Sequence, residues 1–304
     1  MKKTFSIIIA SSLTIQLKAQ SPDQSLLQEL FTTRDSQEFS LALKKAQKVN
    51  LPPQALLEAK FLYYVDRQDY QELAELTPAL KQIKFSASHS EIFTLEDDWL
   101  AITKYCEALQ ALHQKDFPNF KKSITEAFWL SPRQASAFSQ HIEEFKLDQA
   151  MAKLTLDTSQ TLPNLFDEKT STLFEKDKTA TLLYFWSPWS REFVETIDDY
   201  KRTNAEALKH NFHIVSILAE EAELVESDAK ALIKDSNIST LSNWVKETQA
   251  HTLSQSLRIQ NIPTLVLINN QGKVLFNGHP SNPKFWRIVS QLSPKFTQPN
   301  KTIN

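Results

Sequence analysis

The sequence predicts two domains of different fold class. Residues 22–150 are expected to form an all-α array of helical hairpins, and residues 152–293 an α/β domain with a central mixed sheet flanked by helices. Up to Ala150, apolar residues recur at spacings of three and four, which is typical of helices. After Ala150, short extended runs alternate with helical stretches, which favours a sheet whose central strands are parallel.

The first residues have the pattern of a secretory signal peptide. Lys2 and Lys3 precede an uncharged apolar run over 5–15, and Leu17, Lys18 and Ala19 offer a processing site. We therefore expect residues 1–19 to direct export, to the periplasm or the extracellular side of a bacterial envelope. The run is shorter than the roughly 20 residues that span a bilayer, so no stable membrane anchor is expected after processing. A cytoplasmic protein with an apolar N-terminus is the alternative.

The first domain is expected to consist of helices separated by turn-like breaks. After an apolar face made by Leu26, Leu27, Leu30 and Phe31, the predicted helices cover 39–49, 54–65, 70–83, 91–113, 117–130 and 134–147. A weak internal repeat relates the segment around Asp69 to the segment around Asp116. The second copy resembles a tetratricopeptide repeat through Ala108, Phe117, Phe120, Ala127, Leu130 and Pro132. An unrelated helical bundle is the alternative.

In the second domain, extended runs are expected at 154–156, 181–186, 212–218, 264–268 and 273–276. The last two flank Asn269–Gly272, which predicts a hairpin with glycine in its turn. Residues 294–304 are expected to form a flexible tail.

Composition excludes several function classes. The chain has two glycines, so the glycine-rich loops that bind nucleotide phosphates are absent and no nucleotide is expected. Its single cysteine forbids an intrachain disulfide, a CxxC redox pair and a multi-cysteine zinc site. The formal net charge of −2 gives no reason to expect nucleic acid as a partner. We expect neither a metal nor a cofactor.

Two segments carry a family resemblance. Leu182-Leu-Tyr-Phe-Trp-Ser-Pro-Trp-Ser-Arg-Glu-Phe193 resembles the strand-to-helix junction of the thioredoxin-like fold family, where a buried strand leads into Trp-Cys-x-x-Cys. Leu257-Arg-Ile-Gln-Asn-Ile-Pro-Thr264 resembles that family's second hallmark, a cis-proline before a hairpin. With its long segment between Phe212 and Ala250, the chain looks most like TlpA-type envelope thiol-disulfide oxidoreductases, over about residues 152–293.

The resemblance places the nucleophilic cysteine of the family at Ser190 and the resolving cysteine at Phe193. Both thiols are missing, and a serine hydroxyl cannot form the mixed disulfide of thiol exchange. These positions are therefore expected to be degenerate rather than catalytic. Ser190 suits a helix N-cap, with Glu192 favourable in the first turn. A serine activated by a histidine elsewhere in the fold is the alternative. The family's buried acid aligns with Tyr184.

The remaining binding candidates are Trp186, Trp189, Ser190, Ile262 and Pro263. In the family, the turn at the cis-proline presents backbone groups to a substrate peptide. Here we expect the same turn to dock an extended segment, with Trp186 and Trp189 as flanking aromatic surface, unless these residues merely preserve the fold.

The resulting hypothesis is an exported, redox-degenerate thioredoxin-like protein that acts as a protein- or peptide-binding or scaffold module. The alternative is a thiol-disulfide oxidoreductase that works through Cys106 or a partner's thiol. Cys106 lies in a strongly helical segment, where a free cysteine is expected to pack as a small apolar side chain.

Overall fold

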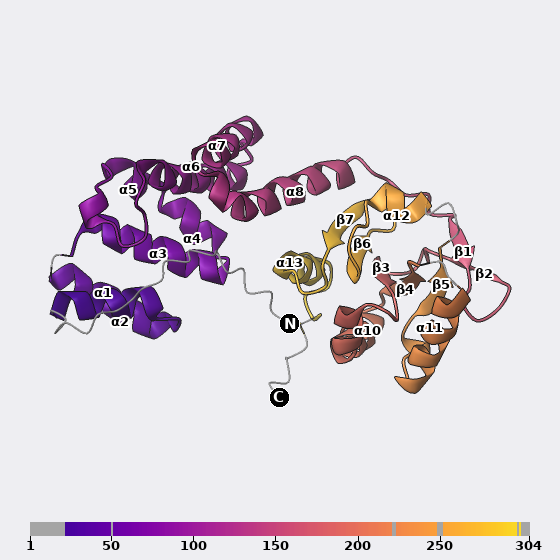
Figure 1. Cartoon of the computed structure of the whole chain (residues 1–304). Helices are drawn as coiled ribbons and strands as arrows, with labels where there is room; N and C mark the ends of the chain where they lie inside the picture. Colours follow the sequence, from indigo (N-terminus) through magenta and orange to yellow (C-terminus); the bar gives the residue numbers. More distant parts are fainter. Residues whose placement is uncertain (1–21, 50, 221–222, 248–251, 297, 299–304) are drawn as a thin grey trace. The chain divides into compact units, whose positions relative to one another are not determined.

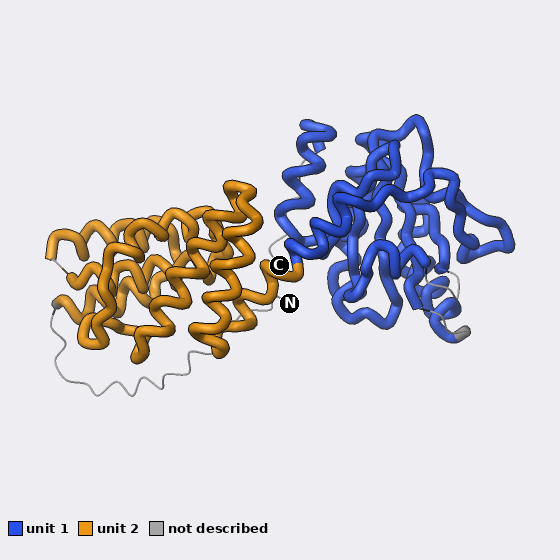
Figure 2. The backbone as a smooth tube through the Cα atoms, turned by 90° about the horizontal axis from the view of Figure 1, so that it is seen from above, with its two compact units in different colours: residues 1, 144–304 blue, residues 2–143 orange. Residues whose placement is uncertain are grey.

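The computed structural model describes residues 22–49, 51–220, 223–247, 252–296 and 298. The predicted signal peptide lies outside these residues, as do residue 297 and residues 299–304 of the predicted tail. The described residues divide into two compact units, one that ends at residue 143 and one that begins at residue 144, shown in different colours in Figure 2.

The N-terminal unit is all-α in the part of the chain that the structure describes, as predicted (Figure 1). Its helices are α1 (Pro22–Thr32), α2 (Ser36–Lys48), α3 (Pro53–Arg67), α4 (Tyr70–Glu75), α5 (Thr77–Gln82), α6 (Glu96–His113), α7 (Phe117–Leu130) and α8 (Ala135–Met151), the last of which continues into the second unit. Two short 3₁₀ turns, Ala87–His89 and Pro132–Gln134, lie between them.

Two of the predicted helices differ from those observed. The helix expected over 70–83 is divided into α4 and α5, because Pro78 has no amide hydrogen to continue the first of them. The helix expected from residue 91 begins at Glu96 instead. The reason is that the buried carboxylate of Glu58 accepts hydrogen bonds from the amides of Glu91 and Ile92, which holds that segment outside the helix.

The internal sequence repeat corresponds to a repeated turn. Asp69 and Asp116 cap α4 and α7, each by accepting a hydrogen bond from an amide three residues on. The residues before them, Gln68 and Lys115, both have left-handed backbone, with φ of 55° and 59°. In each turn the aspartate amide donates to a carbonyl five residues back, so the two helix ends have the same hydrogen-bond pattern.

The C-terminal unit contains the predicted mixed sheet. Its order is β5-β4-β3-β6-β7, from strands β3 (Thr181–Trp186), β4 (His213–Leu218), β5 (Asn243–Lys246), β6 (Thr264–Ile268) and β7 (Val274–Gly278). The pairs β3–β4 and β4–β5 are parallel, whereas β3–β6 and β6–β7 are antiparallel.

The run expected at 154–156 is not a strand. Thr155 makes one isolated bridge to Lys273, and the nearby extended segments are instead β1 (Thr161–Pro163) and β2 (Thr170–Thr172), which form a separate antiparallel pair. Strand β5 is a further addition to the strands that the sequence predicts.

Helices cover both faces of the sheet. On one face, Leu182 and Tyr184 pack with residues of α10 (Ile197–Lys209), α11 (Glu223–Asp235) and α13 (Pro283–Leu292). On the other, Leu183 and Phe185 pack with α12 (Thr252–Leu257) and the end of α8. Phe296 is also buried in the first of these cores, so the packed domain reaches beyond residue 293.

The scarcity of glycine is visible at the helix ends. Among the described residues, five that are not glycine have a positive φ, between 54° and 62°: Gln68, Lys115, Asn211, Asn237 and Arg258. Each follows a helix, and all five helix ends have the same pair of backbone hydrogen bonds. This motif usually has glycine in that position. Gly272, with φ of 79°, is retained in the β6–β7 turn, as predicted, where a Cβ would stand 2.2 Å from the carbonyl oxygen of Leu156.

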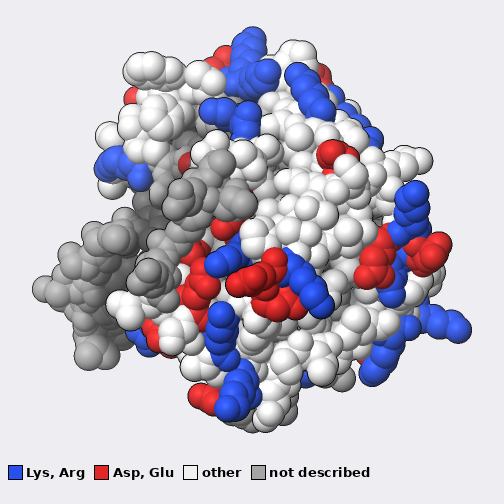
Figure 3. Space-filling view, turned by 90° about the vertical axis from the view of Figure 1, so that its right-hand side faces the viewer, with Lys and Arg blue, Asp and Glu red and all other residues white. Residues whose placement is uncertain are grey.

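The surface charge is mixed. Figure 3 shows Lys and Arg side chains interspersed with Asp and Glu on one face, in keeping with the formal net charge of −2. Within the described ranges, no helix is both long and apolar enough to cross a bilayer.

Candidate functional site

The candidate site begins where the central strand β3 ends. Ser187 follows the strand and is buried, and its hydroxyl donates to Glu220 Oε2 at 2.6 Å while accepting from the Trp189 amide at 3.1 Å. The Ser190 amide donates to the Ser187 carbonyl at 3.2 Å, which closes a tight turn. This turn delivers Ser190 to the start of α9 (Arg191–Glu195).

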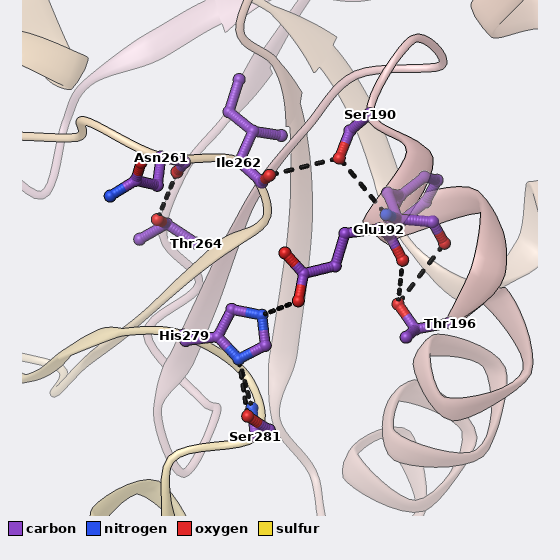
Figure 4. Close-up of polar contacts among 9 residues, drawn as sticks. Ser190, Glu192, Thr196, Asn261, Ile262, Thr264, His279 and Ser281 are labelled. Atoms are coloured by element: carbon purple, nitrogen blue, oxygen red, sulfur yellow. Dashed lines mark hydrogen bonds and ion pairs between the residues drawn. The ribbon is translucent and has the colours of Figure 1, made fainter. Parts of the chain in front are cut away.

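Ser190 is the N-cap of α9, as predicted. Its Oγ accepts a hydrogen bond from the Phe193 amide at 3.3 Å. It donates one to the Ile262 carbonyl oxygen at 3.2 Å, as Figure 4 shows. The hydroxyl therefore joins the two segments that the sequence singled out, although they are far apart along the chain. A carbonyl oxygen can only accept, so the hydroxyl donates its proton to Ile262, and no basic side chain among the described residues bonds to it to activate it as a nucleophile.

Ile262 and Pro263 form the opposite side of this contact. The peptide bond between them is cis. Pro263 is buried and Ile262 is half-buried, and Thr264 next to them donates its hydroxyl to the Asn261 carbonyl at 2.6 Å. Among the described residues, none accepts a hydrogen bond from the Ile262 amide.

Phe193 is a core residue. It is 0% exposed, and its ring lies 5.0 Å from that of Trp186, 5.5 Å from that of Tyr200 and 5.9 Å from that of Tyr184, measured between centroids. Trp244 packs edge-on against Trp186 at 5.1 Å. Phe193, Trp186, Tyr200, Tyr184 and Trp244 form what we call the aromatic cluster beneath α9. Their rings fill the interior of the domain next to the turn.

The two tryptophans have different environments. Trp186 is 0% exposed, so the expectation that it offers a surface for a peptide is wrong. As the last residue of a strand with helices on both faces, it points into the same core as Leu182 and Tyr184. Trp189 lies in the turn and is 53% exposed, and its indole Nε1 donates to Asp228 Oδ2 at 2.9 Å.

Tyr184 does not supply an acid to this site. Burial raises the pKa of its phenol well above the ordinary value, so the side chain stays neutral at any physiological pH. Its ring packs edge-on against that of Tyr200 at 4.9 Å.

A family model described as thioredoxin-like matches residues 178–274. Residues 178–274 form a thioredoxin-like domain. The match begins just before β3, includes the Ser190 turn and the Ile262–Pro263 bond, and ends at the start of β7.

Three solved structures are similar to the chain. A thiol-disulfide oxidoreductase from Bacteroides fragilis is 22% identical, with 45% of this chain and 99% of that chain covered and a TM-score of 0.37. The thioredoxin domain of a thiol-disulfide oxidoreductase from Bacteroides vulgatus is 15% identical, with 45% and 96% covered and a TM-score of 0.37. A thioredoxin-like protein from Aeropyrum pernix is 15% identical, with 52% and 99% covered and a TM-score of 0.37. No curated protein sequence matches the chain.

The thioredoxin-like domain contacts a histidine that sequence reasoning did not select. His279 Nε2 lies 3.1 Å from Glu192 Oε1 in the first turn of α9, and its Nδ1 lies 2.7 Å from Ser281 Oγ (Figure 4). This pair ties α9 to the segment after β7. No sequence motif relates Glu192 to His279, because their proximity follows from where β7 ends in the folded sheet.

Cys106 lies in the N-terminal unit, outside the thioredoxin-like domain. It is 0% exposed in α6, and burial raises the pKa of its thiol far above the ordinary value. A thiol in this state is neither accessible nor ionised, as the packing interpretation predicts. Within the part of the chain that the structure describes, no three His, Cys, Asp or Glu side chains are grouped to hold a metal ion.

Proposed function

We propose that this chain is an exported, redox-inactive thioredoxin-like protein that binds a protein or peptide partner at the turn formed by Ser190 and Pro263. One observation carries the proposal most directly. The residue that caps α9 and faces the cis peptide bond is a serine, and its hydroxyl is engaged with the Ile262 carbonyl. The resemblance places the family's nucleophilic cysteine at this position.

The position of the resolving cysteine supports the same proposal. Phe193 occupies it, and the ring is part of the aromatic cluster beneath α9. Thiol-disulfide exchange needs a thiolate that attacks sulfur and a second thiol that releases the mixed disulfide. The only cysteine of the chain, Cys106, lies in the other unit. Because the chain has one cysteine and the cycle needs two thiols, cyclic thiol chemistry at this turn would need at least one thiol from outside the chain.

Two features support binding rather than a purely structural role. Trp189 keeps 53% of its surface exposed beside the turn, and an exposed aromatic side chain of this kind is typical of interaction sites. The Ile262 amide has no hydrogen-bond acceptor among the described residues. An extended segment lying along Ile262 would supply a carbonyl to it and cover Trp189 at the same time.

Site-specific photocrosslinking tests the binding role. A photoreactive residue at position 189 is expected to capture a discrete partner in cells, and the same residue at Leu208, which is 43% exposed on α10, is not. Capture at both positions, or at neither, would favour the scaffold interpretation in which the domain only stabilises the chain. Thermal melting of both variants controls for folding.

The alternative of an oxidoreductase that uses Cys106 is weakened by the burial of that thiol. We expect a maleimide to modify Cys106 slowly in the native protein and rapidly in urea. Rapid modification without urea would revive the alternative. An oxidoreductase that works through a partner's thiol would instead show reductase activity only when that partner is present.

Export is a separate part of the proposal. It is supported by the basic start, the apolar run and the small-residue site within residues 1–19. Fractionation of the native host is expected to find the full chain outside the cytoplasm. A chain that lacks residues 2–19 is expected to remain inside, and equal distribution of the two would contradict export.

A further inference from the structure

Trp189 and Asp228 form an exposed pair beside the turn of Ser190 and Pro263. The indole Nε1 of Trp189 donates a hydrogen bond to Asp228 Oδ2 at 2.9 Å. Because the N–H group lies at the edge of the ring, this bond fixes the orientation of the indole and leaves its faces to other contacts. Trp189 is 53% exposed, so much of this ring surface is open to solvent.

The carboxylate of Asp228 carries a charge that its contacts do not balance. Asp228 is exposed on α11, and the Trp189 indole is its one hydrogen-bond partner among the described residues. An indole N–H is neutral, so it satisfies one acceptor without offsetting the negative charge. The second oxygen, Oδ1, has no donor within the described ranges and can accept one from a bound molecule.

A second carboxylate near the turn is in the same state. Glu220 is half-buried, and its partner within the described part of the chain is the neutral hydroxyl of Ser187, at 2.6 Å. The same hydroxyl accepts from the Trp189 amide, so it links Glu220 to the backbone beside the exposed ring. A partly buried carboxylate without a cation favours a positively charged group nearby.

The cations close to these two acids are already paired with other acids. Arg191, which follows Ser190, has its Nε 2.6 Å from Glu195 Oε1. Lys246, at the end of β5, is paired with Glu226 of α11. The negative charge beside Trp189 is therefore not neutralised by either of them.

An aromatic face next to a free carboxylate attracts a cation in two ways. The ring attracts an ammonium or guanidinium group that lies within about 6 Å of its centroid. The carboxylate accepts charge-assisted hydrogen bonds from the same group. Leu224 lies one helical turn before Asp228 on α11 and is 73% exposed, so apolar surface adjoins this arrangement. We call Trp189, Asp228 and Leu224 the Trp189 platform.

We propose that the Trp189 platform selects partner segments that carry an arginine or lysine side chain. This inference rests on the proposed function, since it names the chemistry of the polypeptide bound at the turn. The segment lies extended along Ile262, and its cationic side chain covers the face of Trp189 and donates to Asp228 Oδ1. Glu220 adds attraction without direct contact, which strengthens the preference for a basic partner over an acidic one.

Retention of peptide libraries by the immobilised chain from Gln20 onward tests the proposal. The probes are heptapeptides with randomised flanking residues and a fixed central arginine, lysine, citrulline or glutamate. Citrulline keeps the shape of arginine without its charge. We expect the arginine and lysine pools to be retained at least tenfold more than the citrulline and glutamate pools at low salt. This preference should fall at least threefold in 0.5 M NaCl, because salt screens exposed charges.

Matched variants separate the platform from general charge. Asp228→Asn keeps the size of the side chain and removes its charge, so the preference for arginine over citrulline should fall below threefold. Asp235→Asn makes the same change on an exposed residue two turns further along α11, about 10 Å away, and should leave the preference within twofold of the parent. Trp189→Ala should lower retention of the arginine and lysine pools at least fivefold. Thermal melting verifies that each variant is folded.

The outcomes distinguish this inference from the proposed function. Equal retention of the arginine and citrulline pools, with both lost in Trp189→Ala, would overturn the cation preference and leave the peptide site in place. Equal losses of preference in Asp228→Asn and Asp235→Asn would overturn it as well, because the effect would then come from the overall charge. Retention of no pool would also overturn the inference, and photocapture at position 189 would then decide whether the proposed function stands.

Discussion

The substitution Phe193→Ala tests how much the aromatic cluster stabilises the folded C-terminal unit. Phe193 is fully buried against Trp186, Tyr184 and Tyr200, and truncating a buried phenylalanine to alanine costs about 3–5 kcal/mol. A domain of this size has a urea m-value of about 2 kcal/mol per M. The unfolding midpoint of the C-terminal unit should therefore fall by roughly 1.5–2.5 M urea, which tryptophan fluorescence can follow.

The matched control is Val194→Ala in the same helix. Val194 is 42% exposed, so its truncation should change the free energy of unfolding by less than about 0.5 kcal/mol. If Phe193→Ala lowered the midpoint by less than about 0.5 M, or no more than Val194→Ala does, Phe193 would not be a core residue. The position would then be open to a redox residue or to a ligand.

Three further predictions concern features outside the aromatic cluster. Burial lowers the pKa of His141 to about 4, so the folded N-terminal unit favours the neutral imidazole. The free energy of unfolding should therefore be highest above pH 6.5 and fall by up to about 3 kcal/mol as the pH drops toward 4. Urea titrations of His141→Gln should lack this part of the pH dependence. Lys115→Gly, at a left-handed helix end, should raise stability by about 0.5–1 kcal/mol and increase the melting temperature; a decrease would show that the lysine is unstrained. Gly272→Ala should lower the free energy of unfolding by about 2–4 kcal/mol, because the new Cβ would meet the Leu156 carbonyl oxygen. Gly278→Ala is the control: φ of Gly278 is not in the left-handed region, so its loss in the same melting assay should be clearly smaller.

Much of the fold was predictable because its signals are local. The strands over 181–186 and 264–268 have the predicted bounds, since each is a continuous apolar run between polar breaks. The helix over 117–130 is also as predicted, with Asp116 as its cap. The short strand Asn243–Lys246 carries a weaker signal, because only its two central residues are buried and it pairs with a single neighbour within the main sheet.

The site was harder to predict, because its geometry depends on contacts between distant segments. The N-cap role of Ser190 is local and follows from the sequence, whereas its bond to the Ile262 carbonyl needs the folded sheet. Trp186 and Trp189 look equivalent in sequence. Trp186 ends a strand that is buried on both faces, so an alternating pattern cannot indicate that its side chain is inaccessible. Trp189 lies in the turn and is exposed.

Reduction of insulin disulfides by the purified protein tests the central claim most directly. With dithiothreitol as electron donor, we expect no acceleration over the donor alone, and the same result for Cys106→Ala. An ordinary thioredoxin serves as the positive control. Catalytic turnover by the parent protein that is lost in Cys106→Ala would contradict the claim that the protein is redox-inactive. It would place redox chemistry at a thiol that is buried in the folded protein.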